Sequence, residues 1–160
     1  MYKQTYSRYA TRNNLNFIIS GISEIGKLEK EQIKPLNLLS QKIISAIKKK
    51  EIIVIFKENF PIGFIWWTFT KKVPYGINFG NERETFCWVS WSYVVKKERN
   101  KGIGAKLYKL LEEESKKRGV KQMRLDVFTV NKNSEKFHLK LGFKPQLTIF
   151  RKKIKGDPKK

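Results

Sequence analysis

The segment from Arg99 to Ala105 combines basic side chains with two glycines and joins two runs of different periodicity. Residues 85–95 before it are rich in aromatic and β-branched side chains, as in a strand, whereas residues 103–118 after it repeat apolar side chains at helical spacing. Glycines at a strand-to-helix turn let backbone N–H groups approach an anion without interference from Cβ, and a helix N-terminus adds partial positive charge. The segment therefore predicts a phosphate-binding turn, although a glycine pair before a helix also serves as a simple tight turn.

Two common nucleotide-binding motifs do not fit this turn. It lacks the Gly-Lys-Ser/Thr ending of the P-loop, and it lacks the third glycine and the suitably placed acid of the dinucleotide fingerprint. The nature of the expected phosphate ligand must therefore come from another part of the chain.

A second segment, residues 131–143, reads as a short helix with a polar start and a glycine end. Asn131 or Asn133 can cap its first turn, and Gly142 suits the left-handed residue that follows a helix. We expect this helix to lie near the glycine turn if both serve one site.

Together the two segments resemble the GNAT superfamily of acyl-CoA-dependent N-acetyltransferases, over about residues 85 to 153. The family's first motif, Arg/Gln-x-x-Gly-x-Gly/Ala, is matched by Arg99, Gly102 and Gly104. Its second motif is Asn-x-x-Ala-x-x-Phe-Tyr-x-Lys-x-Gly-Phe, and this chain has serine at the alanine position but matches at Asn131, Phe137, Lys140, Gly142 and Phe143. The chain departs from the motif at His138, where the family usually has tyrosine.

The resemblance implies a single-domain α/β fold, with a mixed, mostly antiparallel sheet that splays at the cofactor site and helices on both faces. It also implies acetyl-CoA as the cofactor and acetyl transfer to a primary amine by direct attack through a tetrahedral intermediate. The cofactor-binding residues that it implies are Val94, Arg99, Asn100, Lys101, Gly102, Ile103, Gly104, Ala105, Asn131 and Ser134. Two alternatives stay open, because the basic side chains of the turn can simply be solvated and Asn131 can simply cap its helix.

Three residues are candidates for the chemistry of acyl transfer. The resemblance places the backbone N–H near Ser92 beside the developing oxyanion, and such a donor contributes about 2.7–4 kcal/mol. It places His138 where relatives use tyrosine to protonate the departing sulfur, and an imidazole with a pKa near 6.5 is partly protonated at neutral pH; the alternative is that His138 only packs near the cofactor. The position of a glutamate base in some relatives holds Trp88, which leaves Glu84, or the nearby Glu82, to act through water unless both are surface carboxylates.

The sequence pattern also predicts the elements that position these residues. Strands are expected over residues 16–20, 51–56, 62–70, 85–95, 122–127, 143–146 and 148–153. One or two helices interrupted by Pro35 are expected over residues 27–50, with further helices over 103–118 and 134–141 and a loop over 71–83. Strand alternation would place on one face Glu84, Phe86, Trp88, Ser90 and Ser92.

The composition fits one soluble domain, which we expect to span residues 1–154 and to be followed by a basic tail over 155–160. The chain has 160 residues, and its apolar runs are far shorter than a membrane span. The start of the chain shows no apolar signal segment, so we expect a cytoplasmic protein without membrane contact. The single cysteine, Cys87, excludes an internal disulfide and a cysteine-rich metal site, and a single histidine argues against zinc, so we expect Cys87 to be a buried thiol and no metal to be bound.

The charge of +21, from 35 basic and 14 acidic residues, exceeds what coenzyme A requires. It indicates either an acidic partner or merely a solvated surface. Lysines at positions 132, 136 and 140 form a possible basic stripe, so a nucleic-acid-binding protein on the same scaffold is the second function class. Acetylation of aminoacyl-tRNA or of a nucleic-acid-associated protein would combine both functions. The acceptor amine stays open between a small molecule and a protein or peptide, with a polyamine disfavoured by the charge, and so does a homodimer.

Overall fold

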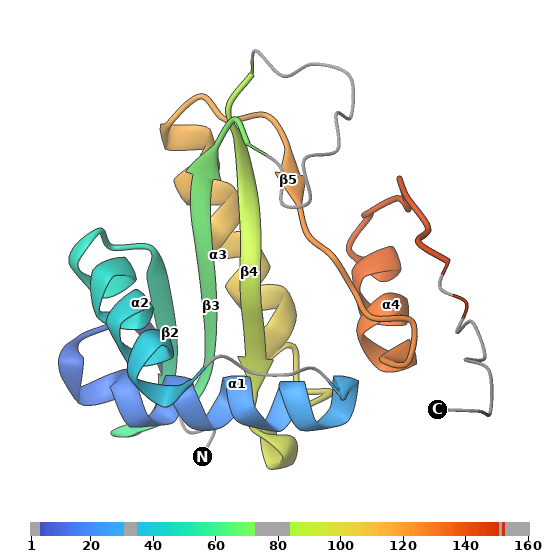
Figure 1. Ribbon diagram of the computed structural model, residues 1–160. Coiled ribbons are helices and arrows are strands. Elements are labelled where there is room, and N and C mark those ends of the chain that lie inside the picture. Colours follow the sequence, from blue (N-terminus) through green and yellow to red (C-terminus); the bar gives the residue numbers. More distant parts are fainter. Residues whose placement is uncertain (1–3, 31–34, 73–83, 151, 153–160) are drawn as a thin grey trace, which may run out of the picture.

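The computed structural model describes residues 4–30, 35–72, 84–150 and 152, which fold around one mixed sheet (Figure 1). The strands lie in the order β1-β2-β3-β4-β5. Their bounds are β1 (Thr5–Tyr9), β2 (Ile52–Lys57), β3 (Phe60–Thr70), β4 (Phe86–Val94) and β5 (Met123–Arg124). The helices are α1 (Leu15–Glu29), α2 (Leu36–Lys48), α3 (Ile103–Lys117) and α4 (Lys132–Lys140), with short 3-10 turns η1 (Arg12–Asn14) and η3 (Lys96–Glu98).

Helices cover both faces of the sheet, as predicted, and each face has its own apolar core. On one face α1 and α2 pack over the sheet, where the buried side chains include Ile18, Ile43 and Phe64. On the other face α3 packs over the sheet, and the partly buried Phe137 of α4 joins a core that includes Trp67 and Leu107. Alternate side chains of the strands therefore pack into two hydrophobic cores, one on each face of the sheet, and β4 lies between α1 and α3.

The β4 strand has a partner along its full length on only one side. It pairs antiparallel with β3 from Phe86 to Val94. On the other side it pairs in parallel with β5, and within the described residues this pairing is confined to Cys87 and Trp88. Beyond that point the chain after β5 turns away from β4 toward α4 (Figure 1). The sheet thus splays at the carboxyl-terminal half of β4, as the predicted fold requires.

A β-bulge in β4 changes which side chains share a face. Two consecutive residues of β3 pair with Trp91 and Val89, which leaves Ser90 as the extra residue. Val89 therefore packs into the core under α3, whereas Trp91 packs against α1. The same shift puts Ser92 on the α3 face. The prediction that Ser92 shares a face with Trp88 is wrong, because a bulge reverses the alternation and leaves no clear sign in the sequence.

The expected strand over residues 16–20 is also wrong, because these residues belong to α1. Their apolar and β-branched run imitates a strand, but Ile18 and Ile22, four residues apart, are both buried against the sheet. The chain enters the helix through a local bond in which the N–H of Thr11 donates to Oδ1 of Asn14 at 2.9 Å. The first strand of the sheet lies earlier, at β1.

The strand pair expected over residues 143–153 does not form in the part of it that the structure describes. Residues 143–150 have no regular secondary structure, and Leu147, Ile149 and Phe150 are exposed. The strand expected over 122–127 is reduced to β5. A strand needs a neighbour to accept its hydrogen bonds, and β5 ends too early to provide one. Most of the expected loop over 71–83, including Glu82, and the expected tail over 155–160 lie outside the described residues.

The remaining helix and hairpin predictions are confirmed where the structure describes them; of the helical stretch expected over 27–50, residues 27–29 end α1, 36–48 form α2 and 31–34 lie outside the described residues. Pro35 precedes α2, the hairpin of β2 and β3 is closed at Glu58 and Asn59, and α3 begins at Ile103. None of the helices in the described part of the chain has the length and apolar character that a bilayer crossing requires.

Candidate active site

The turn between β4 and α3 holds its glycine because of a left-handed backbone. Gly102 is the N-cap residue of α3 with φ 78°, and Asn100, two residues earlier, has φ 62°. A Cβ built on Gly102 meets no atom within 4 Å, so the φ angle and not a lack of space demands glycine. The turn is therefore open on the side where a ligand would approach the helix.

The first turn of α3 presents backbone donors beside this opening. The N–H groups of Ile103, Gly104 and Ala105 precede the first intrahelical donor, that of Lys106, whose N–H bonds the Gly102 carbonyl at 2.9 Å. No acceptor for these three N–H groups is found among the described residues. The Ile103 side chain is buried in the core and anchors the helix start. Free donors at a helix N-terminus on a glycine turn fit a diphosphate.

Gly104 has a different reason to be glycine. A Cβ at this position would lie 2.8 Å from Cζ of Phe137, so the absence of a side chain lets α4 pack directly on α3. The second glycine of the motif therefore joins the two motif segments sterically.

We expect Gly104→Ala to destabilise the fold by about 1–3 kcal/mol, the usual cost of overpacking. In a Phe137→Leu background the obstructing ring is absent, so the added methyl group should cost much less. Urea unfolding of the four proteins of this double-mutant cycle measures the coupling. An equal cost of the alanine in both backgrounds would contradict the packing role.

The basic side chains of the turn are both engaged with protein groups. Nε of Arg99 donates to the Val94 carbonyl at 2.9 Å, and its Nη2 donates to Glu24 of α1 at 2.6 Å. The Tyr93 hydroxyl donates to the same carboxylate at 2.6 Å. Bonds from Tyr93 and then from Arg99 lower the pKa of Glu24. Arg99 therefore ties α1 to the end of β4.

Lys101 is held by the acid of the preceding 3-10 turn. Glu98 is buried and accepts from Lys57 of β2 at 3.1 Å and from Lys101 at 3.3 Å. The hydrogen bond from Lys57, followed by the one from Lys101, lowers the pKa of Glu98. This three-residue contact fixes the turn against the sheet and leaves the backbone N–H groups as its unpaired donors.

The splayed edge of β4 adds further backbone donors. The N–H of Val95 donates to the Ile62 carbonyl of β3 at 2.9 Å. Backbone groups alternate along a strand, so those of Ser92 and Val94 point away from β3, toward the side that β5 has left. The Val94 carbonyl accepts from Arg99, whereas the Ser92 N–H has no acceptor among the described residues.

A chain of polar side chains lies under this edge and links three elements. Oγ of Ser92 in β4 is 3.2 Å from the hydroxyl oxygen of Tyr108 in α3. That oxygen is 2.7 Å from Nε2 of His138 in α4, and Nδ1 of the same ring is 2.8 Å from the Ser134 carbonyl. Tyr108 and His138 are 2% and 7% exposed. The structure therefore brings together three of the site residues predicted from the sequence, Ser92, His138 and Ser134, and Tyr108 connects the first two.

Asn131 lies at the start of α4 and acts as its cap. Its Oδ1 accepts from the Ser134 N–H at 3.2 Å, and its Nδ2 donates to Glu29 at the end of α1 at 2.7 Å. The cap interpretation thus describes the contacts of Asn131 in this structure, and these contacts link α4 to α1.

The family model described as the acetyltransferase (GNAT) family matches residues 23–143. The chain belongs to this family. A search among curated proteins found no match.

Solved structures similar to this GNAT chain share its fold across nearly the whole chain. One is titled a possible acetyltransferase from Clostridium difficile 630, with 18% identity, coverage of 95% of this chain and 99% of that one, and a TM-score of 0.70. An aminoglycoside 6'-N-acetyltransferase from Acinetobacter haemolyticus has 15% identity, coverage of 95% and 99%, and a TM-score of 0.71. An aminoglycoside N-acetyltransferase in complex with CoA has 14% identity, coverage of 96% of both chains and a TM-score of 0.74.

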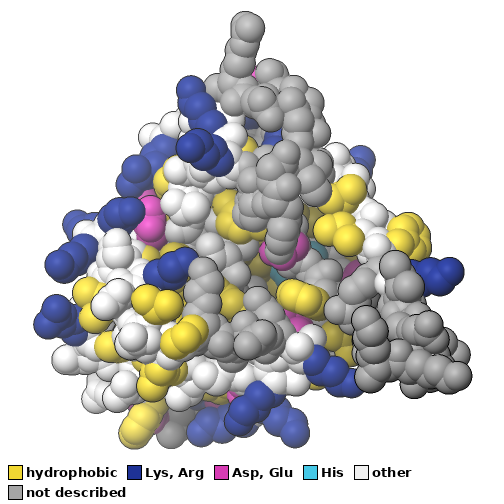
Figure 2. Space-filling model, in the orientation of Figure 1, with side chains coloured by type: hydrophobic (Ala, Val, Ile, Leu, Met, Phe, Trp, Pro, Cys, Tyr) yellow, Lys and Arg dark blue, Asp and Glu magenta, His cyan; other side chains and the backbone are white. Residues whose placement is uncertain are grey.

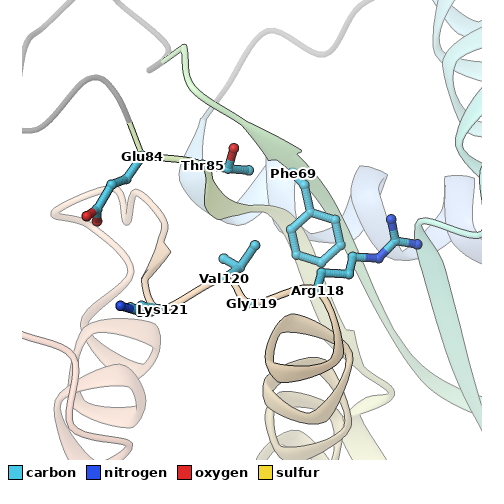
Figure 3. Close-up of a pocket in the computed structure, with 7 residues that line it drawn as sticks. All are labelled: Phe69, Glu84, Thr85, Arg118, Gly119, Val120 and Lys121. Carbon is cyan, nitrogen blue, oxygen red and sulfur yellow. The ribbon is translucent and has the colours of Figure 1, made fainter.

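Glu84 is not brought to this part of the GNAT fold. It lies before β4, eight residues from Ser92, which corresponds to about 26 Å of extended strand. There it lines a hollow of about 520 Å³ that is formed by Phe69, Glu84, Thr85, Arg118, Gly119, Val120 and Lys121 (Figure 3). The expected role of Glu84 as a base near the acceptor amine therefore has no support in the geometry.

Sequence reasoning missed Tyr108, which the apolar stripe of α3 contains. It lies four residues after Gly104, on the helix face that meets α4, and its ring packs edge-on against Phe137 at 5.7 Å. A tyrosine at a core position of a helix signals a buried hydroxyl that needs a partner, and that signal could have pointed to His138.

Cys87 is fully buried, as predicted. Burial raises the pKa of its thiol to about 12, so the cysteine is an unreactive core residue.

Proposed function

We propose that this GNAT family member transfers an acetyl group from acetyl-CoA to a primary amine by direct attack. The observation that carries the proposal is the Ser92 N–H on the splayed edge of β4, which has no acceptor in the described part of the chain, on the strand that leads to the equally unmatched N–H groups of α3. Both sets of donors belong to the backbone, which the fold holds rigidly. The solved CoA complex of a protein with the same fold supports coenzyme A as the ligand.

In this proposal each part of the site has one task. The N–H groups of residues 103–105 and the helix N-terminus bind the diphosphate. The N–H of Val94 bonds the pantetheine arm, and the N–H of Ser92 binds the carbonyl oxygen as negative charge develops on it. Acetyl-CoA supplies an activated acetyl group, because a thiolate is a fair leaving group. Arg99 holds the end of β4 in place from the side of α1.

The class of acceptor amine is tested with a panel. Two similar structures are of aminoglycoside N-acetyltransferases, which supports aminoglycosides as candidates beside small amines and protein amines. The charge of +21 opposes polycationic acceptors, which include aminoglycosides as well as polyamines, so the charge and the structural likeness favour different acceptors and the panel decides between them.

Incubation with acetyl-CoA and kanamycin, spermidine, a lysine peptide or a peptide with a free α-amino group should release thiol in step with acetylation of one of them. Thiol release is followed by absorbance and the product by mass spectrometry. Acetyl-CoA alone is the control, because hydrolysis without an amine releases thiol but yields no acetylated product. An absence of both acetyl-CoA binding and amine-dependent thiol release would contradict the proposal.

A second candidate function, binding of nucleic acid, is favoured by a cluster of exposed basic residues at one end of the sheet. Exposed basic residues lie there at or just after the ends of α2, β3 and α3, namely Lys48, Lys49, Lys50, Lys71, Lys72, Lys116, Lys117, Arg118 and Lys121. Lys50 lies 5.8 Å from the centre of the Tyr9 ring and Arg118 lies 5.0 Å from that of Phe69, so cations and aromatic rings mix at this end. Lys and Arg side chains also line much of the outline in Figure 2. In the expected stripe on α4, Lys132 is paired with Glu135 at 2.9 Å.

Binding of a labelled single-stranded RNA should then weaken steeply with salt, because each neutralised phosphate releases counterions. We expect Lys116→Glu with Lys117→Glu to weaken binding and flatten the salt slope, while Lys136→Glu with Lys140→Glu changes little. Fluorescence anisotropy between 50 and 200 mM salt, about the range over which this effect is largest, is the measurement. Binding that does not depend on salt, or no binding at low salt, would discard this function.

A further inference from the structure

The hydrogen bonds around His138 have a fixed direction. Nδ1 of His138 lies 2.8 Å from the Ser134 carbonyl oxygen, which can only accept, and 3.3 Å from the Ser134 hydroxyl, so the shorter contact assigns the proton to Nδ1. In the neutral ring Nε2 is then an acceptor, and the Tyr108 hydroxyl at 2.7 Å donates to it. The Tyr108 oxygen is thereby free to accept from the Ser92 hydroxyl at 3.2 Å. Every donor in the chain points from Ser92 toward His138.

The surroundings of His138 keep its ring neutral. Burial lowers the pKa of His138, and the bond to the Ser134 carbonyl opposes this only in part. The rings packed against it are Tyr108 of α3 at 5.3 Å, Phe137 of α4 at 5.2 Å and Phe143 after α4 at 5.5 Å. Of these only Tyr108 titrates, and burial raises the pKa of its phenol, as it does for the Cys87 thiol of β4 nearby. The ring is a base at neutral pH.

We propose that His138 accepts the proton lost by the acceptor amine, and that this proton travels through Ser92 and Tyr108. This inference rests on the proposed acetyl transfer and reverses the role expected from the tyrosine of the family motif. In the resting state all donors of this chain point toward His138, so the chain can deliver a proton to the neutral ring, and that ring has no proton on Nε2 to give to sulfur until it has accepted one.

The step balances as follows. The amine nitrogen donates its electron pair to the acetyl carbon, and the C–S bond breaks with its pair on sulfur. The nitrogen passes a proton to Oγ of Ser92, the Ser92 hydroxyl proton moves to Tyr108, and the Tyr108 hydroxyl proton moves to Nε2 of His138. The imidazolium charge balances the thiolate, and return of the proton to sulfur or solvent resets the chain.

The geometry also supplies a candidate for the general base, which the sequence pattern did not provide. Trp88 stands where some relatives have a glutamate, and Glu84 lies at the opposite end of β4. Ser92 is half-buried at the splayed edge, with its N–H on the open side and its hydroxyl on the chain that leads inward. Ser92 would therefore touch the reacting groups, and Tyr108 and His138 would act through it.

The first test uses the fact that His138 is the single histidine of the chain. Long-range proton–nitrogen spectra of histidine-labelled protein should show the Nδ1–H tautomer and a titration midpoint below 6.5. Tyr108→Phe removes the donor to Nε2 and should shift the Nε2 resonance. An Nε2–H tautomer, or a ring charged at pH 7, would overturn the inference without any assay of turnover.

The second test is the pH profile of turnover, with the panel amine that reacts fastest. General acid–base catalysis is worth about 10²–10⁴-fold, so Tyr108→Phe should slow turnover by at least about 10²-fold. In the wild type, turnover should fall at low pH as His138 becomes protonated, and Tyr108→Phe should abolish this acidic limb of the profile. The affinity for coenzyme A should change less than twofold. Ser92→Ala should slow turnover as well, and Ser92→Thr, which restores a hydroxyl, should recover part of the rate.

The outcomes separate this inference from the proposed function. If the wild type is active and Tyr108→Phe shows the same rate and the same acidic limb, the proton chain alone is overturned. A wild-type protein without amine-dependent thiol release would overturn the acetyltransferase function, and the proton chain with it.

Discussion

Proline in place of Ser92 should reduce turnover by about 10²–10³-fold relative to alanine at the same position, because only proline removes the backbone N–H. The N–H of Ser92 points away from β3, so its removal breaks no bond of the β3–β4 ladder. Proline is tolerated at such an edge. The substitution therefore removes one donor at the reacting carbonyl and leaves the strand paired.

The alanine variant is the matched control, because it loses the same side-chain hydroxyl and keeps the N–H. Turnover of both variants is compared at saturating acetyl-CoA, and circular dichroism checks the fold. Equal rates for the proline and alanine variants would show that the Ser92 N–H does not stabilise the transition state.

Valine in place of Gly102 should weaken coenzyme A binding by about tenfold to a hundredfold. Gly102 has φ 78°, and a β-branched residue there costs about 1–3 kcal/mol, which the turn can relieve only by moving its donors. Calorimetric titration with coenzyme A measures the change.

Gly119 offers a control with almost the same backbone. It has φ 67°, and a Cβ there also meets nothing within 4 Å, but it lies beyond the far end of α3, beside the hollow of Figure 3. Gly119→Val should lose stability to a similar degree and bind coenzyme A as the wild type does. Equal weakening by both substitutions would attribute the effect to general strain and not to the turn.

The sequence predicted the parts of the site that depend on local pattern and on the backbone. The strand before the turn, the start of α3 at Ile103 and the cap at Asn131 follow from periodicity and from glycine or asparagine at positions that need them. The donors of the site are N–H groups, which any residue except proline provides. A few side chains that shape the backbone were therefore enough to recognise the resemblance to the family.

The parts that sequence reasoning missed depend on contacts between distant elements. The bulge at Ser90 reverses the faces of β4, and its cause lies in the pairing with β3. The bond between Tyr108 and His138 joins residues thirty positions apart, across α3 and α4. The start of α1 imitates a strand until the burial of Ile22, one helical turn after Ile18, is known. Periodicity describes one element at a time and cannot contain these relations.

The most direct measurement of the proposed site is a map of backbone amide shifts during titration of the wild-type protein with coenzyme A. The largest shifts are expected at the site amides that have no acceptor among the described residues, namely Ser92, Val94, Ile103, Gly104 and Ala105. Saturable shifts at these amides would support the diphosphate turn and the splayed edge as one ligand site. Shifts confined to the far hollow around Val120 and Lys121, or no shifts at all, would contradict it.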